Sequence, residues 1–159
     1  MTRKEQYNQL ILQIAGLIKD ETNLVGILAN VSAALHDTFP ERFFWVGFYL
    51  QENGNMLRLG PFQGSVACYT IPFGKGVCGK AWEEGRTLIV PDVEKFPGHI
   101  ACSSLSRSEI VVPMYDDSHT FRGVLDIDST RLNDFNEDDK EGLERIIELL
   151  MEETQDLFQ

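Results

Sequence analysis

The chain has 159 residues, 43% of them apolar, and a net charge of -11. This length predicts one domain, residues 1–159, with a core that needs no disulfide or metal to hold it. The acidic charge disfavours nucleic acid and anionic membrane surfaces as partners. No stretch approaches the roughly 18 consecutive apolar residues that span a bilayer. No apolar segment follows the charged N-terminus, so we expect a cytoplasmic protein without a secretory signal.

The chain begins with two amphipathic helices and an aromatic-rich strand. Apolar residues recur at helical spacing over 4–19, and again from Thr22, the expected N-cap, to a point before Pro40. A strand is expected over 42–50. Because strand side chains alternate, one face should carry Phe44, Val46, Phe48 and Leu50, and the other Phe43, Trp45, Gly47 and Tyr49.

The rest of the chain is mostly strands joined by turns. Asn53-Gly54 predicts a hairpin, with the return strand over 56–61. Strands at 68–71 and 87–90 should flank a short helix over 76–84, and strands at 109–115 and 121–129 should follow. The residues between the strands at 87–90 and 109–115, 91–106, form a long irregular loop. Loops of this length are typically functional. Asn136 should cap a final helix whose apolar stripe is Leu143, Ile146, Ile147, Leu150 and Leu157.

This order of elements predicts an α+β domain. We expect an antiparallel sheet of about six strands, with the N- and C-terminal helices on one face. The loops and the short helix should cover the other face. A pocket between the sheet and these loops would follow.

The chain has three cysteines, Cys68, Cys78 and Cys102, and no CxxC motif. An odd number in a cytoplasmic chain argues against a disulfide framework, and the usual zinc spacings are missing. Free cysteines are most often buried and inert. A reactive one needs a nearby positive charge or hydrogen-bond donors. His99 and Arg107 are the nearest candidates to Cys102, although a structural hydrogen bond for His99 and an ion pair from Arg107 to Glu109 are the ordinary alternatives.

Acidic and aromatic residues alternate on two of the expected strands. Asp126 and Asp128 share one face of 123–129, and Trp45 and Tyr49 share one face of 42–50. A strand with one solvated face is the ordinary interpretation. If the faces are shared, and Glu109 adds a third carboxyl, the cavity suits a ligand with an ammonium group. A divalent metal is the weaker option, because no histidine partner is evident.

Sequence blocks spread in order from Trp45 to Phe135 resemble the free methionine-(R)-sulfoxide reductase family, whose fold is the GAF domain. Each block is weak alone, and together they are highly specific. At Ser103 the chain departs from the family, which more often has an acidic residue there. The matching blocks are Gly60–Gly64, Ala67-Cys68, Gly74–Gly79, Pro91–Val93, Phe96–Cys102, Ser106–Pro113 and Gly123–Ser129.

The resemblance implies a role for each candidate residue. Cys102 stands at the catalytic cysteine, and Cys68 and Cys78 match the cysteines that resolve the intermediate, with Cys68 as our first choice. Glu109 would both bind substrate and donate a proton to the sulfoxide oxygen. The other substrate-binding positions would be Asp126, Asp128, Trp45 and Tyr49.

The resemblance also implies a reaction. The protein would be a thioredoxin-dependent oxidoreductase, L-methionine (R)-S-oxide reductase, which reduces free methionine-(R)-sulfoxide through a cysteine sulfenic acid and then a disulfide. It would need no cofactor and no metal. The alternatives are a GAF domain that binds a small ligand, or one that senses redox state without turnover. The apolar terminal helices are compatible with a homodimer, and equally with a monomer.

Overall fold

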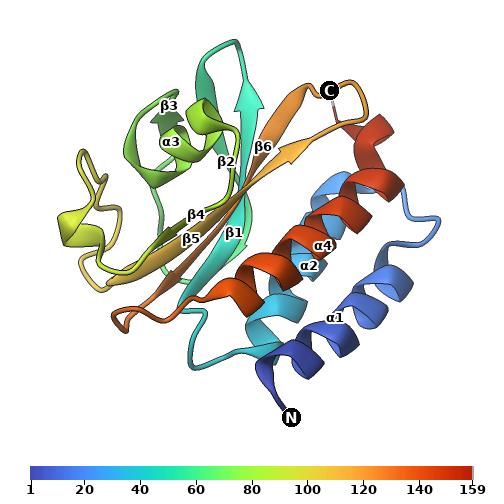
Figure 1. The fold of residues 1–159 in the computed structure, drawn as a ribbon. Coiled ribbons are helices and arrows are strands. Elements are labelled where there is room, and N and C mark those ends of the chain that lie inside the picture. The colour runs from blue at the N-terminus through green and yellow to red at the C-terminus, as the bar shows by residue number, and fades with distance from the viewer. Residues whose placement is uncertain (159) are drawn as a thin grey trace.

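The computed structural model describes residues 1–158 (Figure 1). The predicted α+β order and the six strands are confirmed. No helix in the described residues is both long and apolar enough to cross a membrane. The elements are α1 (Arg3–Ile18), α2 (Leu24–Thr38), β1 (Trp45–Glu52), β2 (Met56–Gln63), β3 (Thr70–Pro72), α3 (Gly76–Glu84), β4 (Leu88–Val90), the 3-10 turn η1 (Val93–Lys95), β5 (Ser108–Tyr115), β6 (Phe121–Ser129), α4 (Glu137–Thr154) and the 3-10 turn η2 (Gln155–Leu157).

The six strands form one antiparallel sheet in the order β3-β2-β1-β6-β5-β4. At its centre, Trp45 of β1 pairs with Asp128 of β6, and Gly47 pairs with Asp126. On the other side of β6, Glu109 of β5 also pairs with Asp128. Residues directly opposite one another in a sheet point to the same face. The register therefore places Trp45, Asp128 and Glu109 on one face.

The two faces of the sheet carry different layers (Figure 1). Helices α1, α2 and α4 cover one face, and α3 with its neighbouring loops covers the other. Leu125 and Ile127 of β6 point into the helix-covered core, and Val124 joins the smaller core under α3. The predicted arrangement of helices on one face and loops on the other is confirmed, and the alternation of β6 directs Asp126 and Asp128 away from the helices.

Helices α1, α2 and α4 each begin at a residue whose side chain caps the helix N-terminus. Thr2 and Glu5 form a capping box on α1, and Asn136 caps α4 as predicted. The prediction for α2 is wrong by one residue. Asn23 is the N-cap, because its side chain accepts a hydrogen bond from the backbone N–H of Gly26 at 3.2 Å.

Two details of the predicted pattern are wrong. Strand β1 begins only at Trp45, and the backbone N–H of Phe43 still bonds to the carbonyl of Phe39 in the turn after α2. Phe43 therefore packs in the helix-side core and Phe44 on the other face, the reverse of the prediction. Leu157 lies in η2, beyond the end of α4, so it does not belong to that helix's stripe.

Candidate active site

A cavity of about 40 Å³ lies on the loop-covered face of the sheet. Strands β1, β5 and β6 form its floor, and α3 and the two cysteine-bearing loops form its walls. The lining residues are Trp45, Tyr49, Val66, Ala67, Ile71, Gly76, Val77, Cys78, His99, Ile100, Cys102, Ser103, Ser106, Glu109, Asp126 and Asp128.

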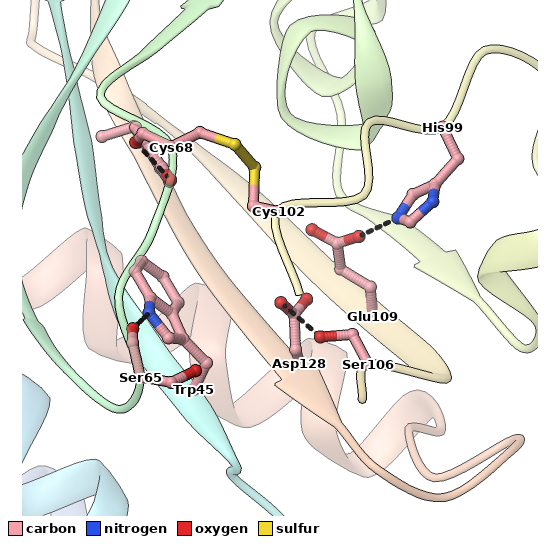
Figure 2. The surroundings of a disulfide bond; sticks show 9 residues. Trp45, Ser65, Cys68, His99, Cys102, Ser106, Glu109 and Asp128 are labelled. Atoms are coloured by element: carbon pink, nitrogen blue, oxygen red, sulfur yellow. Dashed lines mark hydrogen bonds and ion pairs between the residues drawn. A yellow bond between two sulfur atoms is a disulfide. The ribbon is translucent and has the colours of Figure 1, made fainter. Parts of the chain in front are cut away.

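Three carboxyl groups meet on the floor of this cavity. Glu109 and Asp126 are buried, and Asp128 is half-buried with its Oδ1 atom covered. Ser106 donates a hydrogen bond to Asp128 Oδ2 at 3.1 Å (Figure 2). Within residues 1–158, Oδ1 of Asp126 and Oδ1 of Asp128 have no hydrogen-bond partner. A buried acceptor without a donor is costly, so the pair is suited to a ligand that brings N–H donors.

Burial and mutual repulsion set the charges of these carboxyl groups. Burial raises the pKa of Glu109 well above its ordinary value of 4.5, and the charge of Asp126 raises it further. The pKa of Asp128 rises well above its ordinary value for the same two reasons. Burial also raises the pKa of Asp126, but hydrogen bonds from Glu109 and Cys78 oppose that rise. Negative charge therefore concentrates on Asp126, and Glu109 keeps a proton.

The free thiol of Cys78 is part of this cluster. Cys78 lies in α3 and is buried, and burial followed by the charge of Asp126 raises its pKa well above the ordinary value. Its sulfur and one oxygen each from Glu109 and Asp126 lie within 4.8 Å of one another, a spacing that a divalent cation could bridge. A cation there would have to displace the protons of Cys78 and Glu109, so the arrangement favours a hydrogen-bonded cluster over a metal centre.

The two cavity aromatics hold the loop that carries Cys68. Trp45 Nε1 donates to the carbonyl of Ser65 at 3.0 Å, and Tyr49 Oη donates to the carbonyl of Cys68 at 3.0 Å. Their rings stack with centroids 5.8 Å apart. At Gly64 the chain adopts a φ of +141°, and a Cβ there would lie 2.6 Å from the Trp45 ring. Glycine therefore lets this loop pass close over Trp45.

A disulfide between Cys68 and Cys102 joins the two cysteine-bearing loops above the carboxyl groups (Figure 2). Their Cα atoms are 5.5 Å apart although 34 residues separate them in the chain. Cys102 lines the cavity and Cys68 does not. The site thus places one cysteine sulfur at the cavity wall and a second cysteine within bonding distance of it.

His99, in the loop before Cys102, lies next to the carboxyl group of Glu109. Its Nε2 lies 3.8 Å from Glu109 Oε1 (Figure 2). Burial lowers the pKa of His99, while Asp126 opposes this effect, so the imidazole is mainly neutral at neutral pH. Arg107 is exposed, and Glu109 has His99 rather than Arg107 as its basic neighbour.

The structure brings the predicted site residues together. Seven of them line the cavity, and Cys68 is bonded to one of the seven, Cys102. Sequence reasoning missed Ser106 and the apolar wall formed by Ile71 and Val77. Ser106 lies in a loop just before β5, where no strand or helix periodicity predicts which way a side chain points.

Comparison with known proteins places the chain in a family. The family model for the GAF domain matches residues 21–151. The chain is 56% identical over 149 residues to GAF domain-containing protein A of Dictyostelium discoideum, covering 94% of this chain and 92% of that protein. It is 43% identical over 155 residues to the free methionine-R-sulfoxide reductase of Saccharomyces cerevisiae, covering 94% of this chain and 86% of that protein.

Comparison with solved structures leads to the same family. A crystal structure of the free methionine-R-sulfoxide reductase of Neisseria meningitidis in complex with its substrate matches with a TM-score of 0.93 and 46% identity, covering 98% of this chain and 92% of that one. The chain therefore belongs to the GAF domain family and, within it, to the free methionine-R-sulfoxide reductases.

Proposed function

We propose that this protein reduces free L-methionine-(R)-sulfoxide to L-methionine with Cys102 as the nucleophile. The observation that carries the proposal is the position of Cys102 on the wall of a cavity whose floor holds Glu109, Asp126 and Asp128. The yeast and Neisseria relatives that resemble the chain over almost its full length are named for this activity.

The carboxyl cluster supports recognition of a free amino acid. We propose that the substrate α-ammonium donates to the unpartnered oxygens of Asp126 and Asp128, and that Trp45 and Tyr49 cover its apolar atoms. A methionine sulfoxide within a polypeptide has no α-ammonium. Its binding would leave buried carboxyl oxygens without donors, at a cost of about 1–3 kcal/mol.

In the first chemical step, the Cys102 thiolate attacks the sulfur of the sulfoxide. The proton on Glu109 moves to the sulfoxide oxygen as negative charge develops there. The S–O bond of the substrate breaks, the oxygen passes to Cys102 as a sulfenic acid, and methionine leaves. The substrate sulfur is reduced by two electrons and the cysteine sulfur is oxidised by two.

In the second step, the thiol of Cys68 attacks the Cys102 sulfenic acid, a disulfide forms and water leaves. The observed bond between these two cysteines supports Cys68 as the resolving residue. Cys78 keeps a free, buried thiol that donates a hydrogen bond to Asp126, which suits a residue that holds the carboxyl cluster in place. An external dithiol protein such as thioredoxin then reduces the disulfide, which fits a reducing compartment such as the cytoplasm.

The direct test couples the protein to thioredoxin, thioredoxin reductase and NADPH, and compares the free R and S isomers of methionine sulfoxide. We expect NADPH consumption with the R isomer and little with the S isomer. N-acetyl-methionine sulfoxide, which lacks the ammonium, is the matched control and should react poorly. Equal rates with both isomers, or no reaction with the R isomer, would contradict the proposal.

The two cysteine roles are tested by single turnover. Cys102→Ser should form no methionine, because the nucleophile is gone. Cys68→Ser should release up to one equivalent of methionine and then stop, because the sulfenic acid is not resolved. Methionine is measured by chromatography after mixing with excess sulfoxide. Full turnover by Cys68→Ser would assign the resolving role to Cys78, the alternative that the sequence leaves open.

We also propose that residues 1–159 form a single GAF domain that associates as a homodimer. Helix α1 packs against α4, which joins the N-terminal residues to the matched region 21–151; Gln159 lies outside the described residues. Leu12 and Leu17 on α1 and Val25 on α2 remain exposed and support a contact between copies. Sedimentation velocity of the purified protein distinguishes a dimer from a monomer.

A further inference from the structure

Three large apolar side chains stand in solvent beside the disulfide. Val66 is 88% exposed, Tyr69 76% and Leu105 59%. Val66 and Tyr69 belong to the loop that carries Cys68, and Leu105 follows Cys102 by three residues. Because the disulfide holds the two loops with Cα atoms 5.5 Å apart, all three residues lie within three positions along the chain of the same disulfide. Grouped exposed apolar residues of this kind mark interaction surfaces more often than isolated ones do.

The charge around these loops differs from the charge of the rest of the chain. The protein has 25 acidic residues, and none of them lies in segments 53–82 or 95–108, which carry the two cysteines of the disulfide. Five of the 14 basic residues lie there. Arg58 and Lys80 are paired with Glu52 and Glu83 at the borders of these segments, whereas Lys75, Lys95 and Arg107 form no ion pair within the described residues. A protein partner at this surface would therefore meet the positive charge of these three side chains, although the chain as a whole is acidic. The five basic residues are Arg58, Lys75, Lys80, Lys95 and Arg107.

The orientation of the disulfide determines which sulfur such a partner reaches. Cys102 lines the cavity, above Glu109 and Asp128, whereas Cys68 is not part of the cavity lining (Figure 2). The Cys68 loop also carries Val66 and Tyr69, the two most exposed of the three apolar residues. Both cysteines are half-buried, but a thiolate that approaches over these side chains comes from the side of the Cys68 loop rather than through the cavity that Cys102 lines.

We infer that Val66, Tyr69 and Leu105 form the docking surface for the protein that reduces the disulfide, and that its thiolate attacks Cys68. The inference rests on the proposed function and names the partner by its chemistry. That partner is a dithiol protein whose nucleophilic cysteine lies in an apolar surface with acidic residues around it. Apolar contact and opposite charge would together orient the two sulfur atoms for exchange.

The exchange balances in two steps. The partner thiolate forms a bond to Cys68, the bond between Cys68 and Cys102 breaks, and Cys102 leaves as a thiolate in the cavity. The second thiol of the partner loses its proton and attacks the partner sulfur of this mixed disulfide, which releases Cys68. The enzyme gains two electrons and two protons, one proton from the second thiol of the partner and one from solvent, and the partner becomes a disulfide.

The test uses the reductive half-reaction of the intact oxidised protein, with no sulfoxide present. Thioredoxin and dithiothreitol are compared as reductants, and free thiols are counted by alkylation and mass spectrometry at successive times. We expect the double variant Tyr69→Ala/Leu105→Ala to lower the second-order rate constant with thioredoxin about tenfold, as truncation of interface anchors does. The rate with dithiothreitol should stay within about twofold, because neither residue lines the cavity.

Leu132→Ala is the matched control, since this exposed apolar residue lies outside both cysteine-bearing loops, the cavity lining and the proposed dimer contact. It should leave both rates unchanged. The thioredoxin rate should also fall as salt is added, whereas the rate with uncharged dithiothreitol should not. Equal losses with both reductants in the double variant would show a local structural effect and overturn the docking surface.

A second measurement tests the attacked sulfur. Thioredoxin whose second active-site cysteine is replaced by serine should stall as a mixed disulfide, and peptide mapping should find it on Cys68. A bond to Cys102 would overturn this assignment. Failure of the proposed function is distinguished separately, because methionine formation driven by dithiothreitol does not depend on the docking surface.

Discussion

Glu109 lies on the cavity floor opposite Asp128 in the sheet, and its Oε1 lies 3.8 Å from His99 Nε2. Its raised pKa follows from burial first and from the neighbouring carboxylates second. The same environment that keeps a proton available for the sulfoxide oxygen makes ionisation of Glu109 unfavourable in the folded protein. Activity and stability therefore make opposite demands at this residue.

Glu109→Gln should lower turnover by about 100-fold or more, as loss of a general acid does, and should stabilise the protein at neutral pH. Below pH 4.5, both folded and unfolded wild-type chains hold this proton, so no stability is lost. Above it, the unfolded chain releases the proton first, and wild-type stability falls by about 1.4 kcal/mol per pH unit until the raised folded pKa is reached.

Urea unfolding of both proteins across this pH range measures the effect. The free energy difference in favour of Glu109→Gln should grow with pH from 4.5 upward. Two stability curves that run parallel with pH would show that Glu109 has an ordinary pKa in the folded protein, and would remove the argument for it as a proton donor.

Cys78 offers a second test at the residue scale. The oxidised native protein should resist iodoacetamide, because its one free thiol is buried and its pKa is raised by burial and by Asp126. Unfolding without reductant should expose one reactive thiol per chain. Mass spectrometry of the alkylated protein counts the labels. Rapid labelling of the native protein at Cys78 would show that α3 opens far more readily than the structure indicates.

Alternation in β1 and β6 predicted the faces of the site's aromatic residues and aspartates, whereas the roles of the three cysteines came from the family resemblance. The pairing of Cys68 with Cys102 could not be derived from spacing, since it depends on two loops that meet only in the folded chain. The hydrogen bonds from Trp45 and Tyr49 to backbone carbonyls were also beyond sequence reasoning. These aromatics were predicted only as ring surfaces, yet their polar atoms position the Cys68 loop.

At the scale of elements, helix α4 packs closely against α1. Gly142 of α4 has no room for a side chain, because a Cβ there would overlap the ring of Tyr7. The ring is fixed in turn, since Tyr7 Oη donates to Asp139 at 2.6 Å. The two helices can approach this closely only while residue 142 is glycine.

Gly142→Ala should therefore destabilise the protein by about 1–3 kcal/mol through overpacking, although alanine alone favours a helix by up to about 1 kcal/mol. Gly16→Ala in α1 is the matched control, because a Cβ at Gly16 meets nothing within 4 Å. The control should be neutral or stabilising. Chemical denaturation of both variants measures the change in the free energy of unfolding. A Gly142→Ala variant as stable as the control would contradict the close packing.

Most element boundaries could be predicted, because turns and caps are local. The hairpin at Asn53-Gly54, the cap at Asn136 and the whole of α3 lie where the sequence places them. The errors fall where local signals compete. Thr22 and Asn23 are both good N-caps, and the reversed faces of Phe43 and Phe44 arise because the turn after α2 continues two residues further than the aromatic run suggests.

At the scale of the whole molecule, a buried ionic network ties the two ends of the chain to the region before the sheet. Asp139 of α4 is fully buried and accepts hydrogen bonds from Arg3 at 2.8 Å, from Arg42 at 3.0 Å and from Tyr7. The guanidinium of Arg42 also lies over three phenylalanine rings at 5.1 to 5.7 Å. One carboxylate thus joins α1, α4 and the segment before β1.

Asp139→Asn should cost about 1–3 kcal/mol, because it removes the nearer of the two carboxylates that pair with the mostly buried Arg42 and leaves only Asp134, whose Oδ1 lies 3.4 Å from Arg42 Nε. Glu137→Gln, an exposed change in the same helical turn, is the control and should shift stability by less than about 0.5 kcal/mol. Urea unfolding measures both. A cost for Asp139→Asn no larger than that of the control would show that the network adds little to holding the two ends together.

The alternation along β6 also limits how this gene can change. Leu125 and Ile127 fill the helix-side core, while Asp126 and Asp128 reach the cavity. Insertion or deletion of a single codon within this strand would shift the following residues to the opposite face and turn carboxyl groups into the core. Point substitutions can alter one face at a time, but length changes would damage both together. We therefore expect insertions and deletions in the family to fall in the turns at either end of β6.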